Sequence, residues 1–138
     1  MTADYALREH TADVAVEAHA ETLGGVFAAV ADGMAAAMCD DTPESGERFS
    51  LDARATSRER LLYDYLDALI YERDVRGVLP VDNEAAVERD GDEWTLTASA
   101  RGVPLAEVAA RDLKAVTFSD MRIEADDGSW EAYVVFDV

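Results

Sequence analysis

The stretch that decides the fold is VLPVDNEAAVERDGDEWTLTASAR, residues 78–101. Both of its halves have an extended pattern, which predicts strands over residues 78–89 and 93–101. The residues between them, Asp90-Gly91-Asp92, form a turn signal typical of a β-hairpin. Because two strands joined by such a tight turn run antiparallel, this stretch predicts an antiparallel sheet.

The same pattern continues in both directions from this stretch. Toward the end of the sequence, strands over residues 114–124 and 130–137 flank another turn signal, Asp126-Asp127-Gly128-Ser129. Toward the beginning, residues 4–20 contain two extended segments joined by the polar turn His10-Thr11-Ala12-Asp13, and residues 47–55 alternate between apolar and polar. A short helical turn is expected over residues 104–110.

Two amphipathic helices complete the predicted elements. Thr22 can cap the first, and its glycines lower its helix propensity, so packing against a sheet must hold it. Thr56 and Glu59 make a capping box for the second helix, and Gly77 marks its end. The apolar face of the first helix consists of Leu23, Val26, Phe27, Val30, Met34 and Met38, and that of the second of Leu61, Leu62, Tyr65, Leu66, Leu69 and Ile70.

These elements predict an α+β fold, in which a mainly antiparallel sheet packs with the two amphipathic helices. With 138 residues, of which 49% are hydrophobic, the chain is long enough to bury one core without disulfides or a structural metal. We therefore expect a single domain over residues 1–138.

The charge balance is strongly acidic, with 30 acidic against 12 basic residues and a net charge of −18. One interpretation is attraction of a basic partner. The other is a surface adapted to a salt-rich, halophilic cytoplasm, and the even spread of the acids along the chain favours it. Either way, direct nucleic-acid binding is not expected, because it depends on Lys and Arg neutralising phosphates.

Targeting signals and disulfides are not expected either. No stretch approaches the roughly 20 apolar residues of a membrane span, and no secretory signal pattern begins the sequence, so a cytoplasmic location is predicted. Cys39 is the only cysteine and follows an apolar helical pattern, where a buried, unreactive thiol is the ordinary outcome.

No familiar catalytic motif is present, and His10 and His19 are too isolated to suggest a zinc site. Any site is therefore built from oxygen ligands. The chain finishes with an apolar strand, and Asp137 and the α-carboxylate of Val138 place two anionic groups side by side. If this strand lies beside the first ones, Asp13 adds a third. Solvated surface carboxylates are the ordinary interpretation, and a shared Ca²⁺ or Mg²⁺ is the functional one.

Lys114 is the only lysine of the chain, since every other cationic side chain belongs to arginine. Chance survival is one interpretation. The other is a need for a compact, flexible ammonium that a planar guanidinium would not replace.

Four segments together resemble the archease family, in the right order and across essentially the full chain. His10 to Val16 looks like the family's N-terminal signature and Arg58 to Tyr71 like its second helix. Lys114-Ala115-Val116-Thr117-Phe118 is similar to its lysine motif, and Val135 to Val138 to its ending. One departure is Ser119, because family members commonly have a histidine after the aromatic of the lysine motif.

The resemblance implies an accessory protein, not an enzyme, which activates the RtcB-type tRNA-splicing RNA ligase by promoting its guanylylation and multiple turnover. It implies a divalent-metal site at Asp13, Asp137 and Val138, and a functional role for Lys114 in contacting phosphate, nucleotide or a partner. Two other functions stay open. A metal-dependent hydrolase would need a deep pocket and a general base, and a chaperone-like modulator of RNA-processing proteins would need an exposed apolar patch.

Overall fold

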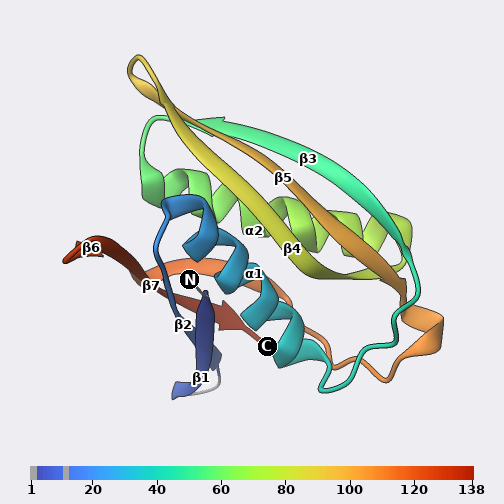
Figure 1. Cartoon of the computed structure of the whole chain (residues 1–138). Coiled ribbons are helices and arrows are strands. Elements are labelled where there is room, and N and C mark those ends of the chain that lie inside the picture. Colours follow the sequence, from blue (N-terminus) through green and yellow to red (C-terminus); the bar gives the residue numbers. More distant parts are fainter. Residues whose placement is uncertain (1–2, 11–12) are drawn as a thin grey trace.

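The computed structural model describes residues 3–10 and 13–138, and for residues 8–10 it describes the backbone only. The described strands form two antiparallel sheets (Figure 1). One sheet has the order β1-β2-β7-β6 and the other the order β3-β5-β4. The strands are β1 (Asp4–His10), β2 (Asp13–Ala20), β3 (Glu47–Ala55), β4 (Val78–Asp90), β5 (Glu93–Pro104), β6 (Ala115–Asp126) and β7 (Ser129–Asp137).

Two helices, α1 (Leu23–Met38) and α2 (Arg58–Arg76), lie between these sheets (Figure 1). Each helix contacts strands of both sheets. The predicted α+β fold is thereby confirmed, and the strands divide into two sheets instead of one. The predicted hairpins are β4–β5 and β6–β7, and in the second the turn residues Asp127 and Gly128 adopt φ angles of 51° and 85°. Such left-handed pairs suit a tight hairpin turn.

Helix α1 is buried on nearly every side because it is enclosed by two sheets. Gly24 and Gly33 are nine residues apart, so at about 100° per residue they lie on opposite sides of the helix. A Cβ on Gly24 would overlap the carbonyl oxygen of Ala85 in β4, and a Cβ on Gly33 would overlap Val16 in β2. Two of the three glycines that lower the helix propensity of α1 therefore let both sheets approach it closely.

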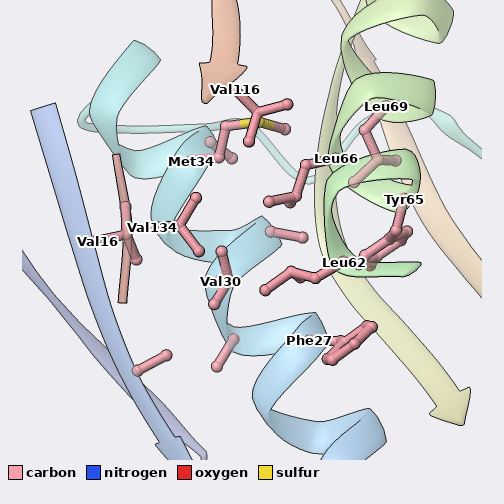
Figure 2. Close-up of a cluster of buried hydrophobic side chains, with 14 of the residues drawn as sticks. Val16, Phe27, Val30, Met34, Leu62, Tyr65, Leu66, Leu69, Val116 and Val134 are labelled. Carbon is pink, nitrogen blue, oxygen red and sulfur yellow. The ribbon is translucent and has the colours of Figure 1, made fainter. Parts of the chain in front are cut away.

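The core gathers side chains from both helices and from both sheets. Figure 2 shows the part of it that lies between the two helices and the four-stranded sheet. Phe27 of α1 and Tyr65 of α2 stack with ring centroids 6.3 Å apart. Val116 of β6 and Val134 of β7 close the cluster from the sheet side. The apolar faces predicted for both helices are confirmed, since all twelve of their residues are buried.

Helix α2 corrects one sequence prediction at its N-terminus. The N-cap is Ser57, not Thr56, and the Ser57 hydroxyl accepts a hydrogen bond of 3.1 Å from the backbone N–H of Arg60. The residue at the third helical position is thus an arginine, so the predicted capping box with Glu59 does not form. Gly77 ends the helix as predicted, with φ 67°.

Strand β6 is less regular than the continuous strand predicted over residues 114–124. Thr117 pairs with Val135 and Arg122 with Tyr133, so four residues of β6 lie opposite a single residue of β7. Phe118 in this bulge stacks on Tyr63 of α2, with centroids 4.2 Å apart. The bulge thus coincides with a contact to α2, which the local sequence pattern does not contain.

The remaining connections follow the predictions more closely. Residues 40–46 form a loop, and the helical turn predicted over residues 104–110 shortens to one 3-10 turn, Leu105–Glu107. The turn predicted between the first two strands includes residues 11 and 12, which lie outside the described residues. Neither described helix has the length and apolarity to cross a membrane.

Candidate functional site

The two ends of the sequence meet in the four-stranded sheet, where β2 lies beside β7. Asp13 and Asp137 are direct cross-strand partners in this pairing. Directly opposite residues of an antiparallel pair have their Cβ atoms about 5 Å apart and on one face of the sheet. The structure therefore brings together the two aspartates that the sequence singled out.

Side-chain alternation places both aspartates on the face of the sheet turned away from the helices. Their neighbours Val14 and Phe136, which also pair, project to the opposite, helix-facing side, where Phe136 is fully buried. Val138 follows Asp137 directly and is 45% exposed. Two carboxylates opposite each other repel, and that repulsion is relieved by a cation or a proton between them.

Lys114 is held next to Asp137 through its backbone. Its N–H donates a hydrogen bond of 2.9 Å to the carbonyl oxygen of Asp137, and the next residue, Ala115, pairs with Asp137 in the sheet. The Lys114 side chain is exposed and makes no ion pair or hydrogen bond with any residue that the structure describes. Its ammonium is therefore available to a partner of the molecule.

The two side chains described at this edge, Asp13 and Asp137, offer carboxylate oxygens, which suit a hard divalent cation. Within residues 3–10 and 13–138, however, no three His, Cys, Asp or Glu side chains gather closely enough to hold a metal ion. Asp13 and Asp137 supply two side chains. A complete site at this edge thus needs a further donor, such as the α-carboxylate of Val138 or a group from a partner.

The segment that leads to Lys114 is fixed by two arginines that the sequence reasoning did not single out. Arg111 binds the C-terminal end of α1, where its backbone N–H donates to Met38 O (2.6 Å) and its guanidinium to Ala37 O (3.0 Å). Its guanidinium also bonds Asp40 at 3.0 Å and lowers the pKa of that carboxyl. The positive charge suits the negative end of the helix dipole.

The second of these is Arg73 of α2, whose guanidinium donates 2.8 Å to the carbonyl oxygen of Leu113. A signal for it was present in the sequence. Leu62, Leu66, Leu69 and Arg73 follow the spacing of one helix face, so an arginine stands where a core residue is expected. Its 9% exposure confirms that it belongs to the buried face.

The cysteine, the histidines and Ser119, which the sequence also drew attention to, lie outside the Asp13–Asp137 pair. Cys39 is buried, as expected, with its thiol 3.0 Å from the carbonyl oxygen of Asp41. His19 is about half exposed and lies near Glu17 and Glu131. Ser119 donates its backbone N–H to Thr117 Oγ1 at 2.7 Å, within the β6 bulge. The side chain of His10 lies outside the described residues.

Comparison with known proteins agrees with the fold and with the family resemblance. Residues 5–138 match the archease protein family (MTH1598/TM1083). The protein archease of Thermococcus gammatolerans is 34% identical over 135 residues, which cover 94% of this chain and 95% of that protein. The named relatives give no support to the predicted halophilic source, which stays a prediction.

Solved structures show the same architecture. The solution structure of Methanobacterium thermoautotrophicum protein 1598 has a TM-score of 0.85 and 30% identity, covering 97% of this chain and 98% of that one. The crystal structure of a Thermotoga maritima archease, described as a possible chaperone, has a TM-score of 0.63 and 21% identity, covering 95% and 94%. The second likeness supports the fold alone. On the family match and the full-length relatives, this chain belongs to the archease family.

Proposed function

We propose that this protein activates an RtcB-type tRNA-splicing RNA ligase by promoting its guanylylation and multiple turnover. In this proposal it acts as an accessory protein and does not itself join RNA. Asp13, Asp137 and the α-carboxylate of Val138 would hold a divalent cation, Ca²⁺ or Mg²⁺, and Lys114 would contact a phosphate, a nucleotide or a carboxylate of the ligase. Family membership supports the partner.

The observation that carries the proposal is the pairing of Asp13 with Asp137. Two carboxylates directly opposite each other on one face of a sheet repel, which destabilises the pairing unless their charge is balanced. A cost of this kind is typical of functional sites. When bound, the cation would neutralise the carboxylates and offer positive charge to a phosphate oxygen of the partner or its nucleotide.

The surroundings of Lys114 support its proposed role. In a chain with a net charge of −18, its ammonium makes no ion pair with a described residue, although its backbone is fixed beside Asp137. A compact ammonium on a flexible stem can reach an anionic group that arrives from outside. The acidic molecular surface makes phosphate bound within the ligase a more plausible contact than free RNA.

The test is a reconstituted ligation assay with the cognate ligase, GTP and the two halves of a cleaved tRNA. We expect Asp13→Ala and Asp137→Ala each to lower activation by about tenfold or more, the range known for disturbed metal sites. Asp52→Ala is the matched control, because Asp52 is exposed on the outer face of the other sheet, in β3. The site proposal fails if both variants activate the ligase as well as the control does.

Two further assays, on the isolated protein and on unrelated RNA-processing proteins, separate the other two functions. Release of phosphate or cleavage of a phosphoester by the isolated protein, lost in Asp137→Ala, would instead indicate a metal-dependent hydrolase. Equal protection of unrelated RNA-processing proteins would indicate a chaperone-like modulator. Activation confined to the ligase is the result that the proposal requires.

A further inference from the structure

Arg73 is a charged residue in the core, and its contacts lead to the candidate site. Its side chain is 11% exposed, whereas the neighbouring Arg76 is 49% exposed and pairs with Glu72 on the surface of the same helix. Burying a guanidinium is costly unless hydrogen bonds satisfy it. The role of Arg73 must therefore be inferred from the groups that its guanidinium binds.

Those groups come from three different elements. Nη1 donates to the Leu113 carbonyl oxygen at 2.8 Å and to Met38 Sδ of α1 at 3.3 Å. Nε donates to Asp74 Oδ1 at 3.1 Å. The shortest of these hydrogen bonds is thus made to a main-chain oxygen in the irregular segment just before β6. One planar guanidinium holds that segment against both helices, which a lysine could not do in the same geometry.

The segment held by Arg73 is the one that carries the only lysine. Leu113 is followed by Lys114, whose N–H donates to Asp137 O at 2.9 Å. Residues 108–114 have no helical or strand hydrogen-bond ladder to fix them. Their position is fixed by the buried Leu113 side chain, by Arg73 from the α2 side and by the Arg111 N–H bonded to Met38 O from the α1 side.

We propose that Arg73 is a positioning residue, which fixes the Leu113–Lys114 peptide so that Lys114 stands at a defined place beside the Asp13–Asp137 pair. The effect on ligase activation rests on the function proposed above, but the effect on Lys114 does not. An apolar residue would continue the Leu62, Leu66, Leu69 face and would ordinarily serve core stability as well or better. An apolar residue would lack the directional hydrogen bond to the Leu113 carbonyl oxygen.

The single lysine makes a direct test available. Reductive methylation with ¹³C-formaldehyde labels Lys114 and the α-amino group alone, so one NMR cross-peak reports the surroundings of the Lys114 side chain. We expect Arg73→Met to displace this peak by more than its linewidth. In unmodified protein, we expect the same substitution to lower ligase activation by about tenfold. Arg76→Met, three residues further along α2, is the control and should change neither quantity.

A second variant covers the case in which Arg73→Met does not fold. Arg73→Lys keeps the buried positive charge but not the planar guanidinium. We therefore expect a folded protein in which the Lys114 peak is displaced in the same direction by a smaller amount. Circular dichroism and the melting temperature confirm folding in each variant. The proposal is overturned if a folded Arg73 variant leaves the Lys114 peak at its wild-type position. If wild-type protein does not activate the ligase, the NMR result still decides the role of Arg73.

Discussion

Asp32 shows how a single partly buried carboxyl can link pH to stability. Its Oδ1 accepts hydrogen bonds from the backbone N–H (3.0 Å) and the side-chain amide (2.9 Å) of Asn83, and so ties α1 to the irregular part of β4. Burial raises the pKa of Asp32 above its usual 3.8, the negative charge of Asp82 raises it further, and the bonds from Asn83 partly oppose both.

The raised pKa of Asp32 gives a prediction with a definite sign. The folded protein holds this proton more tightly than the unfolded chain, so the contribution is complete below pH 3.8 and is lost as the pH rises through the folded-state pKa. Ionised Asp32 therefore costs stability near neutral pH. Asp32→Asn keeps the acceptor oxygen, and we expect its free energy of unfolding, relative to wild type, to increase with pH above 3.8.

Urea unfolding at several pH values measures this difference. Because removal of any carboxylate relieves general repulsion, the comparison is with the exposed Asp52→Asn variant, whose gain with pH should be smaller. An equal gain in the two variants would show that the burial of Asp32 has no effect on its ionisation in the folded protein.

At the scale of elements, the sequence predicted which segments form helices and strands and missed where they are locally irregular. Turn signals and periodicity located both hairpins, because those signals are local. The bulge in β6 was not predicted, because it coincides with the stacking of Phe118 on Tyr63, which is a tertiary contact. The N-cap of α2 was misplaced by one residue, since Thr56 and Ser57 are both good capping residues and only the backbone path decides between them.

This one-residue correction can be tested by a pair of substitutions. We expect Ser57→Ala to lower the free energy of unfolding by about 1 kcal/mol, because the N–H of Arg60 loses its acceptor. Thr56→Ala should change it by no more than a few tenths of a kcal/mol, which is usual for surface substitutions. Chemical denaturation of the two variants distinguishes them. A larger loss for Thr56→Ala would restore the capping box predicted from the sequence.

At the scale of the whole molecule, the strand order creates the candidate site. The sequence identified Asp13, Asp137, Val138 and Lys114 as candidates, but their proximity depends on β2 and β7 being neighbours, which no local pattern specifies. The helical spacing marks Arg73 as a core position, but the acceptors of Arg73 and Arg111, Leu113 O and Ala37 O, lie 40 and 74 residues away and could not be predicted. Family resemblance supplied what local physics did not.

The net charge of −18 also acts on the whole molecule. Self-repulsion among surface carboxylates destabilises the compact state and is screened as the Debye length falls from about 10 Å at 0.1 M salt to about 3 Å at 1 M. We expect the melting temperature to rise by several degrees when KCl is raised over this range. A melting temperature that stays constant or falls would mean that repulsion among the surface carboxylates does not measurably destabilise the folded protein.

Cation binding measured by isothermal titration calorimetry tests the central claim, that carboxylates from the two ends of the chain share one ion. At 1 M KCl, which screens diffuse attraction, we expect wild type to bind one Ca²⁺ or Mg²⁺. Asp13→Asn and Asp137→Asn should each abolish that binding. The double variant should show no further loss of cation binding beyond that of either single variant. A short C-terminal extension, which displaces the Val138 carboxylate, should weaken it. Wild-type affinity in the double variant would contradict the account.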